Sequence, residues 1–185
     1  MYVTLQKPKG IRRWLQLYGL YLEAFPASER KPWTMIRKMY RKGVTDIWCL
    51  EKDGAFAGLA ITINSPDIVL LDYFAVEKKQ RCGGIGRAAL GKLMEKYCDR
   101  GFFVEIESTL EESLERPLRL RRKNFYLSCG LEEMHTTAEL FGVNMELLGV
   151  RCHLDYTGYR EFYRVHYSPW AAEHIWPCKY EKTDS

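Results

Sequence analysis

The chain has 185 residues, and its 28 Lys and Arg against 24 Asp and Glu leave a formal net charge of +4 at pH 7. So small a positive charge argues against a protein that binds nucleic acid by neutralising many phosphates. Hydrophobic residues make up 46% and charged residues 28%, a balance typical of a globular chain and unlike a disordered, collagenous or coiled-coil one. We expect one domain over residues 1–185.

Membrane, leader and metal signals are not found in the sequence. The longest uncharged run, residues 54–66, is too short and too polar to cross a bilayer, and the first residues lack the pattern of a secretory leader. The six cysteines form no Cys-x-x-Cys pair, and the four histidines lie at no metal-ligand spacing. We predict reduced and mostly buried thiols, no metal, no membrane contact and a cytoplasmic location.

Two helices are predicted at the start of the chain. Apolar residues at helical spacing stop at Pro26, which predicts an amphipathic helix with one buried face. The residues expected on that face are Ile11, Trp14, Leu15, Tyr18, Leu22 and Phe25. A second, shorter helix should follow Pro32, a residue suited to a first helical turn, and stop at Gly43.

A β-hairpin and a buried strand are predicted next. The strand-like runs 45–51 and 55–64 are joined by Lys52-Asp53-Gly54, and Asp-Gly between apolar runs is a strong signal for an antiparallel hairpin. Residues 68–76 are apolar apart from Asp72, which indicates a strand covered on both faces in the middle of a sheet.

The rest of the chain alternates helices and strands. We predict a helix over 86–100, a strand over 102–108, an acidic loop over 109–116, a helix over 117–129 and strands over 134–141 and 145–154. Strand-helix-strand units give parallel neighbours and the hairpin adds antiparallel ones. The order therefore predicts an α+β fold with a mixed, mostly antiparallel central sheet flanked by helices. The aromatic tail from Asp155 onward is expected to pack, or to form a subunit contact that would make the protein a homodimer.

The most informative segment is a glycine loop, residues 81–87, between the buried strand and the following helix. Gly83, Gly84 and Gly86 lack Cβ atoms, so the backbone can turn sharply and bring successive N–H groups close to a ligand. The helix that begins there adds its positive end. Arg81 and Arg87 can add charge-assisted bonds, and together these groups predict a pyrophosphate site.

The spacing within the loop distinguishes among phosphate-binding families. Without Gly-Lys-Ser or Gly-Lys-Thr, a nucleoside triphosphate P-loop is excluded, and a Rossmann turn would follow a first strand. The pattern is Arg-x-x-Gly-x-Gly, read as Arg81-Cys82-Gly83-Gly84-Ile85-Gly86, with Val76 five residues upstream and Leu90 four downstream. It resembles the acyl-CoA signature of the GNAT superfamily of N-acetyltransferases.

A second segment strengthens this resemblance. The run Phe125-Tyr126-Leu127-Ser128-Cys129-Gly130-Leu131 is similar to the later helix motif of the superfamily, an aromatic pair with Gly four residues after the Tyr. The resemblance is strongest over residues 44–154 and implies the GNAT fold, acetyl-CoA as co-substrate and an amine as acceptor. Residues 155–185 form an aromatic C-terminal extension outside it.

The resemblance also implies roles for individual residues. Phe74, Ala75 and Val76 would pair with the pantetheine arm as an added strand does, and Arg81, Cys82, Gly83, Gly84, Ile85, Gly86 and Arg87 would bind the pyrophosphate. Tyr126 would act as the general acid that protonates the departing thiolate. Arg119 stands where the family often has an Asn that contacts the cofactor.

A base, or a path through water, must take a proton from the acceptor amine. Glu105 and Glu107 are two apart in a predicted strand, so they share one face, and Asp72 is the third candidate. Ion pairs with basic residues of the following helix explain the two glutamates equally well. Further acid follows at Glu111, Glu112 and Glu115, and these favour a cationic acceptor.

The sequence therefore predicts an N-acetyltransferase that moves an acetyl group from acetyl-CoA to a primary amine by direct attack in a ternary complex. The acceptor would be a cationic small molecule or a basic side chain. The alternative is a non-catalytic acyl-CoA-binding regulatory protein. Nucleic acid is not expected as a partner.

Overall fold

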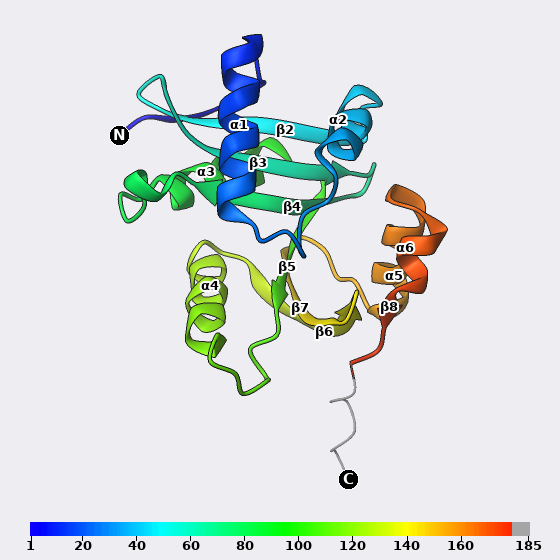
Figure 1. Ribbon diagram of the computed structural model, residues 1–185. Helices are drawn as coiled ribbons and strands as arrows, with labels where there is room; N and C mark the ends of the chain where they lie inside the picture. Colours follow the sequence, from blue (N-terminus) through cyan, green and yellow to red (C-terminus); the bar gives the residue numbers. More distant parts are fainter. Residues whose placement is uncertain (179–185) are drawn as a thin grey trace. The chain divides into compact units, whose positions relative to one another are not determined.

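The structure, a computed structural model, describes residues 1–178. The chain divides into two compact units, Met1–Arg100 and Gly101–Ser185, which are described one after the other (Figure 1). That residues 1–185 form one domain stays a prediction.

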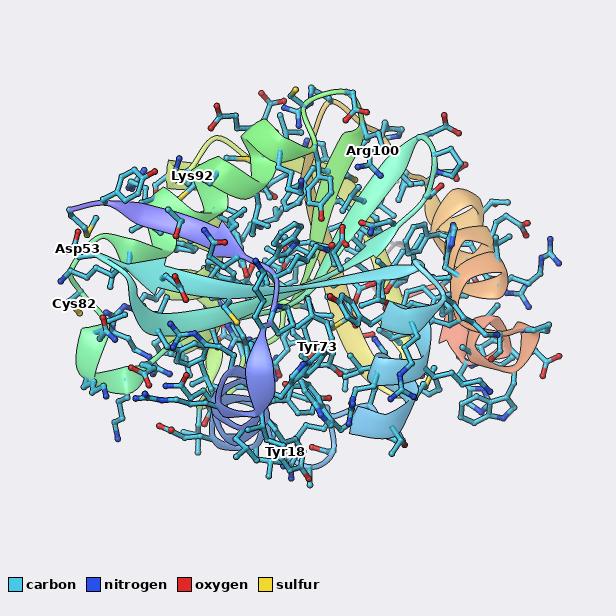
Figure 2. All side chains as sticks on the ribbon, turned by 90° about the horizontal axis from the view of Figure 1, so that it is seen from above. Tyr18, Asp53, Tyr73, Cys82, Lys92 and Arg100 are labelled. Carbon is cyan, nitrogen blue, oxygen red and sulfur yellow. The ribbon has the colours of Figure 1, made fainter. Side chains whose placement is uncertain are left out.

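The first unit is built around four antiparallel strands. In chain order its elements are β1 (Val3–Gln6), α1 (Gly10–Ala24), α2 (Trp33–Arg41), β2 (Thr45–Lys52), β3 (Ala55–Asn64), β4 (Ile68–Val76), the 3-10 helix η1 (Lys78–Gln80) and α3 (Ile85–Lys96). Its strands lie in the order β1-β2-β3-β4. Helices α1 and α2 cover one face of these strands, and α3 covers the other (Figures 1 and 2).

The predicted elements of this unit are confirmed within a few residues. The β2–β3 turn places Asp53 at φ 49° and Gly54 at φ 82°, so both turn residues are left-handed, as the twist of a two-residue hairpin requires. Strand β4 is buried or half-buried throughout. Strand β1 was not predicted, because its four residues are too few for a periodic signal and only its pairing with β2 defines it.

The predicted buried face of α1 is wrong for most of its residues, although Trp14 and Phe25 do pack against the core. The helix buries Leu17, Leu20 and Tyr21 against strands β2 to β4, in a cluster with residues such as Ile61 and Tyr73. Three of the residues predicted for the buried face, Ile11, Leu15 and Leu22, are 80%, 63% and 43% exposed. Apolar residues occur on several sides of this helix, so the periodic pattern fits more than one face, and the sheet selects the face that complements its own side chains.

The second unit also contains four antiparallel strands. Its elements are β5 (Gly101–Glu107), α4 (Arg116–Ser128), β6 (Glu132–Leu140), β7 (Val143–Val150), α5 (Tyr156–His166), α6 (Pro169–Glu173) and β8 (Ile175–Trp176). The strands lie in the order β5-β7-β6-β8. Helix α4 lies on one side of these strands, and α5 and α6 lie on the other (Figure 1).

The aromatic tail packs within this second unit. Tyr159, Phe162 and Tyr163 of α5 are buried, and the side chains of Asp155 and Ser168 cap the two helices of the tail. The packing interpretation is therefore confirmed as far as residue 178, and residues 179–185 of the predicted extension lie outside the described part.

The cysteines differ from the prediction of mostly buried thiols. All six are free, but Cys49 and Cys178 alone are buried, and Cys82 and Cys98 are exposed. Within residues 1–178 there is no helix long and apolar enough to cross a bilayer. The same residues contain no cluster of three His, Cys, Asp or Glu side chains that could hold a metal ion.

Gly58 of β3 permits a close approach to the end of β4. A Cβ atom there would lie 2.4 Å from the Ala75 carbonyl oxygen and 2.9 Å from Leu50 Cδ1. We expect Gly58→Ala to lower the free energy of unfolding by about 1–3 kcal/mol, because backbone must shift to admit the methyl group. Chemical denaturation measures this change.

Gly91→Ala is the matched control, since no atom lies within 4 Å of its Cβ position in α3. It should raise the free energy of unfolding by about 0.5–1 kcal/mol through helix propensity. If Gly58→Ala were as stable as the wild-type chain, the close approach of Gly58 to the Ala75 carbonyl would not contribute to stability.

Candidate active site

The glycine loop connects the end of β4 to α3 through a left-handed turn. Cys82 has φ 64° and Gly84 has φ 74°, and Gly84 immediately precedes the first residue of α3. Glycine adopts such values without strain, whereas Cys82 is a non-glycine residue in the same region. Residues 81–84 are exposed, and Figure 2 shows Cys82 at the outer edge of the first unit.

The amide groups of this loop are open. The backbone N–H groups of residues 82–86 donate to no group among residues 1–178, and the Ala88 amide donates to the Gly84 carbonyl at 3.0 Å. Unpaired amides at a helix N-terminus carry partial positive charge and accept an anionic ligand. This is the arrangement that the sequence predicted for pyrophosphate.

Two side chains fix the loop. Arg81 donates from Nε to the carbonyl of Val76, the last residue of β4, at 3.0 Å. Gln80 donates from Nε2 to the Phe56 carbonyl at 3.0 Å and to Glu77 Oε2 at 2.8 Å. Arg81 thus anchors the turn with one nitrogen and keeps its terminal nitrogens for other contacts. Gln80 was not predicted, because its role depends on a carbonyl in a different strand.

Tyr126 lies on α4, where it is 9% exposed and its ring lies 5.2 Å from the ring of Phe125. Burial raises the pKa of Tyr126 to about 12, although the nearby Arg122 acts in the opposite direction. The phenol is therefore protonated at neutral pH, as a general acid must be. Within residues 1–178 the Tyr126 hydroxyl has no hydrogen-bond partner.

Glu105 and Glu107 are both half-buried on β5 and alternate with the buried Val104 and Ile106, as the strand pattern predicted. The Glu107 carboxylate lies 3.2 Å from Arg119 and 3.3 Å from Arg122, both on α4. Glu105 accepts a hydrogen bond from the Tyr163 hydroxyl at 2.8 Å. The ion-pair interpretation thus holds for Glu107, whereas the hydroxyl bound to Glu105 is neutral.

Asp72, the third candidate base, belongs to the first unit. It is the extra residue of a bulge in β4, where the register with β3 shifts. Its side chain is 5% exposed, and Oδ1 lies 2.6 Å from Lys31 Nζ. Oδ2 is buried and has no hydrogen-bond partner among residues 1–178. An orphaned buried carboxylate oxygen is costly unless it serves a ligand.

The acidic loop before α4 is paired with arginines of that helix. Glu112 lies 2.7 Å from Arg116, and Glu111 lies 3.8 Å from Arg119. The arginine that occupies the family's Asn position is therefore engaged with Glu107 and this loop. Charge pairing neutralises much of the acidic run.

A buried polar network fixes α4, and sequence reasoning missed it. Lys123 Nζ lies 2.8 Å from Glu133 and also contacts Glu146, and both side chains of the Lys123–Glu146 pair are no more than 10% exposed. Glu146 also accepts hydrogen bonds from the Thr109 amide and hydroxyl. No local pattern reveals these contacts, because the network joins residues from β6, β7, α4 and a loop.

Comparison with known proteins establishes the family. The sequence model described as the acetyltransferase (GNAT) family matches residues 14–130. The chain belongs to this family and is an acetyltransferase. No curated protein sequence matches the chain.

Solved structures show the same fold. A protein from Bacteroides thetaiotaomicron assigned to the GNAT family is 21% identical, with 89% of this chain and 96% of that chain covered and a TM-score of 0.74. An aminoglycoside 6'-N-acetyltransferase complexed with coenzyme A is 14% identical, with 81% and 96% covered and a TM-score of 0.64. A GNAT family acetyltransferase from Elizabethkingia anophelis with acetyl-CoA bound is 14% identical, with 82% and 97% covered and a TM-score of 0.58.

These comparisons confirm the resemblance that the glycine loop and the Tyr126 segment indicated. They also confirm the predicted mixed, mostly antiparallel sheet flanked by helices.

The Glu146 network should make stability depend on pH. Burial acts to raise the pKa of Glu146, but hydrogen bonds from Lys123 and Thr109 outweigh it and hold the pKa below its ordinary value. The ionised Glu146 carboxylate therefore stabilises the fold fully above its unfolded-state pKa. This stabilisation is lost as pH falls through its folded-state pKa. At neutral pH we expect Glu146→Gln to lower the free energy of unfolding by about 3 kcal/mol, because Lys123 loses a buried partner.

Denaturation curves recorded from neutral pH to below about pH 4 test this, since the difference between the two proteins should shrink in acid. Glu161→Gln is the control, because Glu161 forms an exposed ion pair with Arg164 and its removal should leave stability unchanged. A constant difference across the pH range would contradict the assignment to the Glu146 carboxylate.

Proposed function

We propose that the protein transfers an acetyl group from acetyl-CoA to a primary amine by direct attack of the amine on the thioester in a ternary complex. The observation that carries this proposal is the row of unpaired amides, residues 82–86, at the N-terminus of α3. A helix N-terminus with open amides suits the pyrophosphate of CoA. Bound CoA in one structural neighbour and bound acetyl-CoA in another support it.

The cofactor residues follow from the glycine loop and the end of β4. Residues 81–87 would bind the pyrophosphate, through the amides of residues 82–86 and through the guanidinium groups of Arg81 and Arg87. Phe74, Ala75 and Val76, which precede the loop on β4, would pair with the pantetheine arm. Anchoring by Arg81 and Gln80 keeps the amides aligned before the ligand arrives, which lowers the cost of ordering them.

The transfer consists of one substitution at the acetyl carbon. The amine nitrogen forms a bond to that carbon, the carbon–sulfur bond breaks, and CoA leaves as a thiolate. Tyr126 is proposed to give its phenolic proton to the thiolate, a role supported by its family motif and by its protonated state at neutral pH. The amine must also lose a proton.

Glu105, Glu107, Asp72 and water are the candidates for the group that takes this proton. Two arginines engage Glu107, which favours a structural part for it. Glu105 accepts from a neutral tyrosine hydroxyl, and Asp72 has an oxygen without a protein partner among residues 1–178. The open oxygen therefore favours Asp72 over Glu107.

The acceptor is proposed to be the amine of a cationic small molecule or of a basic side chain. The aminoglycoside acetyltransferase among the structural neighbours supports a cationic acceptor. Asp72 supports it also: Lys31 pairs with its Oδ1, and its buried Oδ2 is left to accept a hydrogen bond from an ammonium group. The acidic run before α4 adds little, since arginines pair with it.

Gly84 gives a test of the pyrophosphate assignment. We expect Gly84→Val to raise the dissociation constant for CoA at least about tenfold, or 1.4 kcal/mol, because a β-branched residue cannot hold the left-handed φ that aligns the amides. Isothermal titration calorimetry measures this constant. Gly43→Val is matched, because Gly43 has nearly the same φ, 75°, and lies after α2. Equal CoA affinities in the two variants would refute the assignment.

Tyr126→Phe tests the general acid. Thiol release from acetyl-CoA is followed with a panel of amines, and mass detection identifies the product. With the best acceptor, kcat should fall about 100-fold while KM for the amine changes little. Tyr156→Phe is the control, because that hydroxyl donates to the Ile175 carbonyl, and kcat should be unchanged. Unaltered turnover in Tyr126→Phe would remove the assigned role, and CoA binding without turnover for any amine would refute the proposed reaction.

A further inference from the structure

An apolar stripe runs along the outer side of α1. It consists of Ile11, Leu15, Tyr18 and Leu22, which are 80%, 63%, 39% and 43% exposed. Their spacings of four, three and four residues are those of the a and d positions of a heptad. Figure 2 shows Tyr18 on the outer side of α1, whereas Tyr73 lies toward the strands.

This stripe is more than a scatter of exposed apolar side chains. Single exposed leucines are common on protein surfaces, but four successive seam positions on one helix form a continuous band. A seam limited to the a and d positions is the narrow apolar face that another helix covers in a coiled coil. The inner face of α1, with Leu17, Leu20 and Tyr21, is already covered by the strands.

One edge of the stripe has opposite charges near its two ends. Arg12, Gly19 and Glu23 follow one another along this edge at spacings of seven and four residues, and all three are exposed. Neither Arg12 nor Glu23 forms an ion pair within residues 1–178. Between them, Gly19 has no atom within 4 Å of its Cβ position, which leaves room for a close helix approach.

We propose that α1 is the contact between two copies of this chain, which pack their α1 helices antiparallel across a two-fold axis. Such an interface uses the same patch on both copies, so the patch must complement itself. In the antiparallel arrangement, Arg12 of each copy lies near Glu23 of the partner subunit. A parallel arrangement would instead set Arg12 near Arg12 and Glu23 near Glu23, which is unfavourable.

The charges also favour a second copy over a lipid surface. Helices that lie in a membrane interface are rich in Lys and Arg on their polar face. The edge of this stripe has one acidic and one basic residue, and each can pair with the opposite charge of a second copy. Together they give no net attraction to anionic lipid.

Sedimentation velocity of the full chain over a concentration series tests the interface. The wild-type chain should sediment as a dimer, and Leu15→Glu should shift it to a monomer, because a charge would be buried in the seam. Val165→Glu, an equally drastic change at a 59% exposed position of α5, should leave the dimer intact. Circular dichroism confirms that both variants are folded.

Charge exchange tests the antiparallel orientation. Arg12→Glu and Glu23→Arg should each raise the dimer dissociation constant about tenfold, and the double variant should restore the wild-type value. A double variant as weak as either single one would refute the antiparallel arrangement.

A wild-type chain that stays monomeric throughout would overturn the proposal. So would a dimer that survives Leu15→Glu. Binding of the monomer to vesicles of anionic lipid, with Leu15→Glu abolishing it, would assign the stripe to a membrane surface and also refute the dimer.

Discussion

The left-handed turn between β4 and α3 is the constraint on which the proposed chemistry depends. Positive φ values at Cys82 and Gly84 turn the chain so that the amides of residues 82–86, at the N-terminus of α3, have no partners among residues 1–178. Unpaired amides are unfavourable unless water or a ligand satisfies them. The rest of the first unit stabilises this turn, through the Arg81 contact to β4 and the close approach of Gly58 to Ala75.

In the second unit, ion pairs hold a helix that carries many positive charges. Helix α4 contains four arginines and Lys123, and acidic residues on the neighbouring strands and loop pair with several of them. The Lys123–Glu146 pair is buried, so its position is determined more strictly than that of an exposed pair. Tyr126 follows Lys123 by three residues on the same helix, so the network also fixes the helical turn that carries the phenol.

The carboxylates show how tertiary contacts change the meaning of a sequence pattern. Glu105 and Glu107 look equivalent in an alternating strand, and both are half-buried on β5. Their partners differ, because α4 supplies arginines to Glu107 and α5 supplies a tyrosine hydroxyl to Glu105. Asp72 looked like a single polar interruption in a buried strand, and it proves to be the extra residue of a bulge paired with Lys31.

The sequence by itself determined the features with local causes: the Asp53-Gly54 hairpin, the buried strand before the glycine loop, the loop and the Tyr126 segment that indicated the family. Only the tertiary structure decided which face of α1 is buried, that β1 pairs with β2, and that Lys123 meets Glu146. Backbone turns and periodicity depend on neighbouring residues, so a sequence shows them directly. The partner of a side chain depends on which distant surfaces meet, and that is settled by the folding of the whole chain.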